Sequence, residues 1–325
     1  MLPGLASGNM LGYRFVVRSL VAGACLLVLA SGCTRTDVTA GPTTEVPTPV
    51  STTGPDKTST PTHTKTPPSP SPTPTPARIP RTFATKNFST SLTDVNQWVP
   101  MAPGIQSVMK GFVNVGGRRL PHVRVVTVTD VTKMIDGVRA TLVLDQDFDG
   151  GQLSEQAIDY LAEDAGGNVW YVGSYTEAYE GGQFLSATDA WLAGVNGAVP
   201  GLYLPGNPMT GTPPFYQTKI PGGETTTAQV IKVGQKTCVP FKCYTDVVVI
   251  QEQGAENKYW APGVGGILTE PLSGTAQETE ELVNITQLSS KALAELSAEA
   301  LKLDRNAATH APSVFGGSPP AKQAH

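Results

Sequence analysis

Alternating apolar and polar residues fill much of the chain between residues 123 and 289. Residues 123–133 (VRVVTVTDVTK) alternate β-branched with polar side chains, as expected of a strand that buries one face. Asp136-Gly137 follows at a hairpin position, and RATLVLDQDF supplies the return strand. The alternation recurs, with Gly, Asn and Asp at the turns, in residues 157–180, 227–270 and 280–289. Because no long helix separates these strands, the pattern predicts a mainly β fold built on an antiparallel meander.

Two segments depart from this alternation. From Ser290 to Arg305 apolar residues share one face at helical spacing, which predicts one C-terminal helix packed on the sheet or on its open edge. Residues 188–217 (TDAWLAGVNGAVPGLYLPGNPMTGTPPFYQ) carry Gly, Pro or Asn every few positions, together with large apolar side chains. This composition predicts a long structured loop packed by its own side chains. The loop is either a lid over the sheet or a cover for one sheet face, and the cover is the simpler interpretation.

The N-terminus carries a short apolar run. Residues 20–30 are uncharged and follow Arg14 and Arg18; 11 residues fit a signal-peptide core of ~7–15 and fall short of the ~20 that span a bilayer. Ala30, Ser31 and Gly32 precede Cys33 in an arrangement that resembles the bacterial lipoprotein signal, although Ala30 stands where leucine is commonest.

The lipoprotein resemblance implies that residues 1–32 are a signal peptide and that Cys33 receives lipid, including palmitate. Two acyl chains on one cysteine would anchor the chain to the outer face of the cell membrane. An ordinary secretory leader cut at the same small residues, and an uncleaved anchor, are the alternatives. Met10 also opens a tidier leader than Met1, so either methionine is a candidate start.

Composition changes abruptly after Cys33. Residues 33–80 are mostly Thr, Pro and Ser and cannot bury enough apolar area to fold, which predicts a disordered tether. Extended polyproline geometry, at ~3.1 Å per residue, would let it reach on the order of 100 Å. Residues 81–305 are expected to form a single β-rich globular domain, and the Pro- and Gly-rich residues 306–325 a disordered tail. The net charge of −4 and the dispersed basic residues argue against a nucleic-acid partner.

An acidic motif is the first candidate for chemistry. Asp145, Asp147, Asp149 and Gly150 match the opening D-x-D-x-D-G of a calcium loop, in which alternating carboxylates turn onto one cation. The twelfth position, which needs a bidentate Glu, holds Gln156, and no helix pair flanks the motif. A solvated acidic turn between two strands is therefore the stronger interpretation, and no cofactor is expected.

Cys238 and Cys243 form the second candidate. They flank a proline in TCVPFKC, and the export signal places them in a compartment that permits disulfides. No further His or Cys stands nearby to complete a metal site, and the C-x-x-C spacing of redox motifs is absent. The pair predicts a structural disulfide that closes a small loop between neighbouring strands.

Catalytic signatures are missing. His122 is the only histidine of residues 81–305, and its position after Pro121 suggests a surface or edge residue rather than a base. No nucleophile elbow, zinc-protease motif or phosphate loop occurs. A pair of carboxylates could still approach each other across strands, the candidates being Asp159, Glu163, Asp164 and Glu177. The expectation is a protein that is not an enzyme.

Three stretches carry a second resemblance: GNVWYVGSYTEAY, the glycine- and proline-rich loop, and ENKYWAPGVGGILTE. Together, over Ile135 to Glu270, they resemble a family of uncharacterised secreted bacterial domains. That family implies a strongly curved, half-barrel-like antiparallel sheet and no catalytic residues. Ser174 and Tyr175 stand where the family has an acidic residue after Gly173, which weakens any ligand role for that position.

Aromatic residues supply a candidate ligand platform. Trp170 and Tyr171 alternate faces on one strand, as do Tyr259 and Trp260 on another, and Trp191 opens the loop. Outward-facing rings could bind a ligand, although cross-strand packing is the commoner use. The sequence thus favours a membrane-anchored extracytoplasmic lipoprotein with a non-catalytic β domain that binds a small amphiphile or an envelope protein. A calcium-stabilised or hydrolytic domain that uses the acidic clusters is the alternative.

Overall fold

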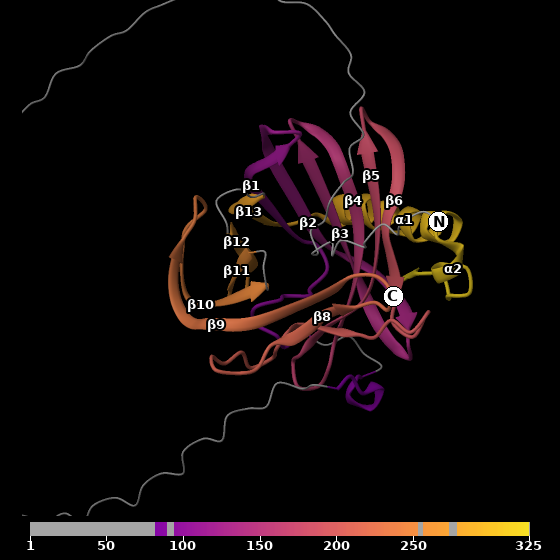
Figure 1. The fold of residues 1–325 in the computed structure, drawn as a ribbon, viewed down its shortest axis with the longest axis horizontal. Coiled ribbons are helices and arrows are strands. Elements are labelled where there is room, and N and C mark those ends of the chain that lie inside the picture. The colour runs from indigo at the N-terminus through magenta and orange to yellow at the C-terminus, as the bar shows by residue number, and fades with distance from the viewer. Residues whose placement is uncertain (1–81, 90–93, 253–255, 273–277, 325) are drawn as a thin grey trace, which may run out of the picture. The chain divides into compact units, whose positions relative to one another are not determined.

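The computed structural model describes residues 82–89, 94–252, 256–272 and 278–324. Among these residues, 14 strands join one antiparallel sheet, which confirms the prediction of a mainly β, curved meander (Figure 1). The strands are β1 Ile105–Val115, β2 Arg118–Ile135, β3 Val138–Asp149, β4 Gln152–Glu163, β5 Val169–Glu180, β6 Gln183–Leu192, β7 Gly201–Leu204, β8 Phe215–Lys219, β9 Thr225–Cys238, β10 Cys243–Glu252, β11 Glu256–Ala261, β12 Gly265–Pro271, β13 Thr279–Gln287 and β14 Lys322–Gln323.

The sheet consists of two meanders, and the first strand of one pairs with the last strand of the other. Its order is β6-β5-β4-β3-β2-β1-β13-β12-β11-β10-β9-β8, so that β1 and β13, far apart in sequence, pair at the junction. The short strand β7, inside the predicted loop 188–217, pairs with β5. An isolated bridge from Val199 to Lys219 and a hydrogen bond from Gln217 Nε2 to Tyr203 O (3.2 Å) bring β8 beside β7. The sheet therefore curls from β6 round to β8 and encloses an interior (Figure 1).

Hairpin turns follow the local sequence. Asp136 and Gly137, with φ of 44° and 79°, form the two-residue turn between β2 and β3 that the sequence predicts. Gly150 and Gly151 also have positive φ, 58° and 84°, and connect β3 to β4. Glycine tolerates this left-handed geometry without a steric penalty. The second turn ends β3, the strand that carries the acidic motif.

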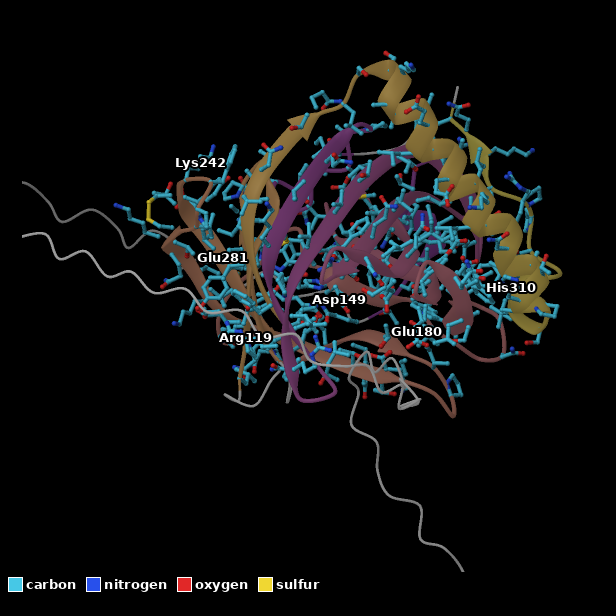
Figure 2. The ribbon with its side chains drawn as sticks, turned by 90° about the horizontal axis from the view of Figure 1, so that it is seen from above. Arg119, Asp149, Glu180, Lys242, Glu281 and His310 are labelled. Atoms are coloured by element: carbon cyan, nitrogen blue, oxygen red, sulfur yellow. A yellow bond between two sulfur atoms is a disulfide. The ribbon has the colours of Figure 1, made fainter. Side chains whose placement is uncertain are left out.

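Helix α1, Ser290–His310, crosses one face of β2 to β6 (Figure 2). The Ser289 hydroxyl caps its start by accepting a hydrogen bond from Ala292 N (3.3 Å). Ala300, Leu303 and Ala307 are fully buried against the sheet. The helix is longer than the sequence indicates, and none of the helices in the described part of the chain is long and apolar enough to cross a membrane.

The prediction of a disordered tail at residues 306–325 is wrong for the part that the structure describes. A short helix, α2 (Pro312–Phe315), follows α1, and β14 then pairs with β2. Phe315 is 2% exposed, with its ring centroid 5.8 Å from that of Tyr175 and 6.1 Å from that of Tyr160. The burial of Phe315, the hydrogen bond from Ala321 N to Asp304 Oδ2 (2.9 Å) and the pairing of β14 with β2 together hold this segment on the domain. Residues 1–81, which include the predicted signal peptide, Cys33 and the predicted tether, lie outside the described residues.

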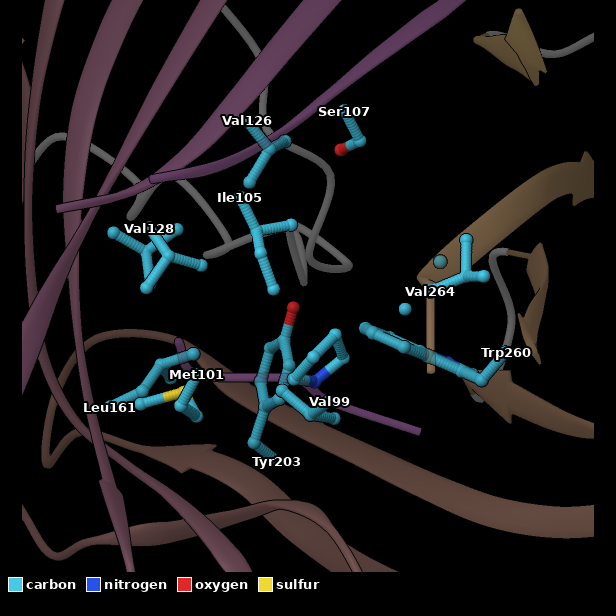
Figure 3. A pocket seen from close by; sticks show the side chains of 14 residues that line it. Val99, Met101, Ile105, Ser107, Val126, Val128, Leu161, Tyr203, Trp260 and Val264 are labelled. Atoms are coloured by element: carbon cyan, nitrogen blue, oxygen red, sulfur yellow. The ribbon is translucent and has the colours of Figure 1, made fainter. Parts of the chain in front are cut away.

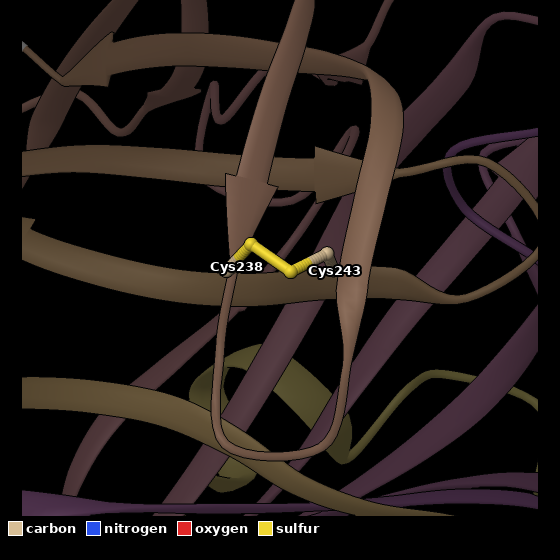
Figure 4. The surroundings of a disulfide bond; sticks show 2 residues. All are labelled: Cys238 and Cys243. Atoms are coloured by element: carbon tan, nitrogen blue, oxygen red, sulfur yellow. A yellow bond between two sulfur atoms is a disulfide. The ribbon is translucent and has the colours of Figure 1, made fainter. Parts of the chain in front are cut away.

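Cys238 and Cys243 are joined by a disulfide at the end of the β9–β10 hairpin (Figure 4). They face each other in the register of the two strands, which explains why a loop of this size can be closed. Beyond the disulfide, Phe241 N donates to Leu282 O (3.1 Å), so the hairpin tip rests on β13. The bond therefore stabilises a tip that packs on the middle of the sheet.

Candidate functional site

An apolar cavity lies inside the curled sheet (Figure 3). Its volume is about 80 Å³, and it is partly open to solvent. Tyr203 and Trp260 form one side, and their ring centroids are 5.4 Å apart in an edge-to-face arrangement. The other lining residues are small and aliphatic, including Val99, Met101, Ile105, Ser107, Val126, Val128, Val143, Leu161 and Val264. A cavity of this kind is suited to an apolar or amphiphilic group of modest size.

The aromatic residues that the sequence groups into one platform lie in different places. Trp170 packs edge-to-face on Phe83, with centroids 5.4 Å apart, and donates from Nε1 to Asp164 Oδ2 (3.0 Å). Tyr259 donates to Glu270 Oε2 (2.7 Å) and, by strand alternation, faces away from Trp260. These two residues therefore stabilise the fold and do not line the cavity.

The other three predicted aromatics connect through a residue that the sequence did not single out as a site residue. Tyr203 lies 5.4 Å from Trp260 and 6.0 Å from Tyr171, and Tyr171 lies 5.1 Å from Trp191, between ring centroids. Tyr171 also donates to Asp159 Oδ1 (2.5 Å). A continuous row of four rings thus runs from Trp191 on β6 to Trp260 at the cavity. Sequence spacing could not reveal it, because Tyr203 comes from β7, whose pairing with β5 is long-range.

Charged residues continue the same strand faces beyond the cavity. On β2, Val128 and Val126 line the cavity, and Arg124 and His122 follow at the next alternate positions. On β3, Val143 is followed in the same way by the three aspartates. Residues two apart on a strand share a face, so both strands change from apolar to charged along one surface. The cross-strand register pairs His122 with Asp149 and Arg124 with Asp147.

Asp145, Asp147 and Asp149 lie in strand β3, and Asp145 is buried, so the favoured interpretation of a solvated acidic turn is wrong. The alternative of a calcium loop fails as well, because an extended backbone cannot wrap the three carboxylates around one ion. Each has a different neighbour. Asp145 accepts hydrogen bonds from Arg124 Nε at 2.9 and 3.0 Å, and Asp149 Oδ1 lies 2.8 Å from His122 Nδ1. The sequence matched the calcium-loop motif because aspartates on one face of a strand have the same two-residue spacing as the first ligands of that loop.

His122 is buried, with 3% exposure, which corrects the expectation of a surface or edge histidine. Its Nε2 atom lies 2.8 Å from Glu278 Oε1, 3.5 Å from Glu280 Oε1 and 3.6 Å from Asp147 Oδ1. Burial favours the neutral imidazole, but the carboxylates of Asp149, Glu278 and Glu280 outweigh it and raise the pKa of His122 to about 12. We name His122, Asp147, Glu278 and Glu280 the His122 cluster.

Arg124 is the main fixed counter-charge beside this cluster. Besides its contacts with Asp145, it donates from a terminal nitrogen to Glu280 Oε2 (3.3 Å), which also accepts from Thr269 Oγ1 (3.0 Å). Burial acts to raise the pKa of Glu280, but Arg124 and His122 outweigh it and hold that pKa well below its usual range. For Asp147, burial and then the charges of Asp145 and Glu278 raise the pKa well above its usual range. Negative charge thus exceeds positive charge at this end of the interior.

Of the His122 cluster, the sequence analysis named Asp147 as a candidate ligand, dismissed His122 as a surface or edge residue, and did not consider Glu278 or Glu280. The alternation H-x-R at residues 122–124 and E-x-E at residues 278–280 indicates charges on one strand face. Their convergence depends on the long-range pairing of β1 with β13, which places Glu280 opposite Gly111 and hence next to His122. Local patterns carry no information on that pairing.

The four acidic residues considered for hydrolysis belong to separate hydrogen-bond networks. Each has its own hydrogen-bond partners: Asp159 accepts from Tyr171 and Ser174, Glu163 from Val95 and Asn96, Asp164 from Asn168 and Trp170, and Glu177 from Tyr175 and Asn306. Partners of this kind fix loops, strands and α1 in place. The four carboxylates therefore have structural roles in the described part of the chain.

No family model and no curated protein matches the chain. Among solved structures, the chain is similar to one described as "a putative lipoprotein from Parabacteroides distasonis ATCC 8503", at 13% identity and a TM-score of 0.25. The match covers 61% of this chain and 100% of the other. A score this low carries no argument about fold or function. The resemblance of residues 135–270 to a family of secreted domains therefore stays a prediction.

Proposed function

We propose that the chain is an extracytoplasmic lipoprotein, anchored to the cell membrane through lipid on Cys33, whose β domain binds a small amphiphile without catalysing a reaction. The apolar cavity beside Tyr203 and Trp260 is the observation that carries the binding role. The sequence before Cys33, and the Thr- and Pro-rich residues after it, support the anchor and the tether.

The position of the cavity agrees with binding of an amphiphile. Val126 and Val143 line it, and two residues further along the same strand faces stand Arg124 and Asp145. An apolar group in the cavity would therefore have charged and hydrogen-bonding groups within reach of its polar end. Because helix α1 covers the opposite face of β2 to β6, the interior is the surface of these strands that remains for a ligand.

Binding can be tested with a cavity-filling variant of the full chain. Ser107→Leu places an isobutyl group in the cavity, whereas Lys110→Leu adds the same group at an exposed position of the same strand. With N-phenyl-1-naphthylamine as the probe, we expect Ser107→Leu to weaken binding at least about tenfold, equivalent to about 1.4 kcal/mol. Lys110→Leu should bind as the unmodified chain does. Equal binding by both variants, with both folded by circular dichroism, would contradict the cavity as the binding site.

The anchor requires a separate test. Cells that express the chain are labelled with radioactive palmitate and then fractionated. We expect label on the chain and recovery in the membrane fraction, and loss of both in Cys33→Ala. Release of the unmodified chain into the medium without label would show an ordinary secreted protein instead.

A further inference from the structure

The His122 cluster brings four potential metal ligands together from distant parts of the chain. One ligand atom from each of His122, Asp147, Glu278 and Glu280 lies within 4.8 Å of the other three. His122 comes from β2, Asp147 from β3 and Glu280 from β13, and Glu278 directly precedes β13. Sheet pairing fixes the positions of the three strands, so three of the four ligands are placed by the fold itself.

Three atoms of this cluster are buried without a hydrogen bond: His122 Nε2, Asp147 Oδ1 and Glu280 Oε1. His122 and Glu280 are 3% and 1% exposed, so water does not readily satisfy them. Glu278 Oε1 lies 2.8 Å from Nε2 and forms an ion pair with the protonated imidazole, so a metal ion bound here would take the place of that proton. An unsatisfied buried group costs about 1–3 kcal/mol, and more when it is charged. Three such atoms that converge on one point indicate that a cation belongs between them.

The neighbours of the cluster hold its ligands as metal sites usually do. The Nδ1 atom of His122 faces Asp149 Oδ1 at 2.8 Å, which leaves Nε2 directed at the cluster. Glu280 uses Oε2 for Arg124 and Thr269, which leaves Oε1 directed at the same point. A carboxylate behind a ligating imidazole, and hydrogen bonds behind a ligating carboxylate, are the common supporting contacts of such sites.

The donor types decide between cations. Calcium and magnesium prefer oxygen ligands, whereas an imidazole nitrogen with carboxylates suits zinc and its neighbours among the transition metals. We propose that His122, Asp147, Glu278 and Glu280 bind a divalent transition-metal cation of the zinc and manganese class. This site is independent of the cavity and of the lipid anchor. Of the acidic motif it uses Asp147 alone, and its other ligands are His122 of β2, Glu280 of β13 and Glu278 directly before β13.

Calorimetric titration of the full chain tests the proposal. The chain is purified without a polyhistidine tag, stripped with a chelator, and titrated with Zn²⁺, Mn²⁺ and Ca²⁺ in turn. We expect one equivalent of Zn²⁺ or Mn²⁺ to bind in the micromolar range or tighter, and Ca²⁺ to bind far more weakly. Cobalt provides an independent readout, since Co²⁺ bound by a nitrogen and oxygen donors absorbs visible light.

Two ligand variants and one matched control separate a specific site from loose attraction to acids. Glu278→Gln changes a half-exposed ligand without disturbing the core, and His122→Asn removes the nitrogen donor. Each should weaken binding by at least about tenfold, the lower limit seen when even supporting contacts are lost. Glu281→Gln removes the same charge from the exposed face of β13 and should leave affinity unchanged. The proposal is overturned if the unmodified chain binds none of these cations at one equivalent, or if Glu278→Gln and Glu281→Gln bind equally.

Discussion

Two buried polar clusters differ in whether their charges are balanced and their polar atoms hydrogen-bonded. In the first, which we name the Lys133 cluster, Lys133 Nζ lies 2.8 Å from Asp304 Oδ1 of helix α1. Tyr160 donates to the same oxygen (2.8 Å), and Ala321 N donates to Oδ2 (2.9 Å). One positive charge meets one negative charge, and both carboxylate oxygens accept hydrogen bonds.

The His122 cluster differs in each of these respects. Carboxylates outnumber the positive groups beside them, and three buried polar atoms have no hydrogen bond. Burial and neighbouring charges raise the pKa of Asp147, a sign that its charge is disfavoured in the fold. In the Lys133 cluster every buried charge has a partner, and the cluster joins a helix, the sheet and the C-terminal segment. In the His122 cluster, buried polar atoms without partners destabilise the fold unless a cation binds. The contrast therefore distinguishes a cluster that stabilises the fold from one that we propose binds a ligand.

Removal of Asp304 should have the largest effect on stability. In Asp304→Ala, Lys133 remains buried with no counter-charge, and Tyr160 and Ala321 lose their acceptor. We expect the free energy of unfolding to fall by about 3–5 kcal/mol, measured by urea denaturation. Glu295→Ala, at an exposed position of the same helix, should change it by less than about 0.5 kcal/mol.

A double variant sharpens that prediction. Lys133→Met with Asp304→Leu removes both charges and keeps similar volume, so it should recover most of the loss, because an apolar pair avoids the desolvation of two ions. If the single variant lost under about 1 kcal/mol, the pair would contribute little, and the contrast between the two clusters would fail.

The same type of substitution should have the opposite sign in the His122 cluster. Asp147→Asn keeps the shape of the side chain and removes one of several like charges, so the cation-free chain should become more stable, by about 1 kcal/mol or more. Urea denaturation in the presence of a chelator measures this change. Zn²⁺ at a hundredfold excess over Kd should add about 2.7 kcal/mol to the unmodified chain and much less to the variant. A cation-free Asp147→Asn that is less stable than the unmodified chain would show that the cluster is already balanced.

The sequence predicted the elements of this fold well and the partners of its side chains poorly. Period-two alternation identified the hairpin at Asp136-Gly137 and the strand that holds Val143 and Asp145, because both depend on neighbours in the chain. The burial of His122 depends on Glu280, 158 residues away, and on the register of β1 with β13. The tail was predicted to be disordered from its Pro and Gly content. The local pattern does not show that Phe315 is buried against the sheet.

Tyr160 provides the smallest test, within the Lys133 cluster itself. Burial, followed by the charge of Asp304, raises the pKa of Tyr160 well above its usual value near 10. A group that stays neutral in the fold but ionises in the unfolded chain makes the fold less stable as pH rises above the unfolded pKa. Tyr160→Phe should therefore cost about 1 kcal/mol near pH 7, the value of one lost hydrogen bond.

Above about pH 10, the free energy of unfolding should fall with rising pH more steeply for the unmodified chain than for Tyr160→Phe. The difference between the two slopes corresponds to the release of up to one proton on unfolding. The two curves should converge there, because the variant has no phenol to ionise at this position. Urea denaturation between pH 7 and 11 measures both curves, with Tyr216→Phe, whose side chain is largely exposed, as the matched control. Parallel curves for Tyr160→Phe and the unmodified chain would mean that this phenol ionises equally in both states, and that the Lys133 cluster admits water.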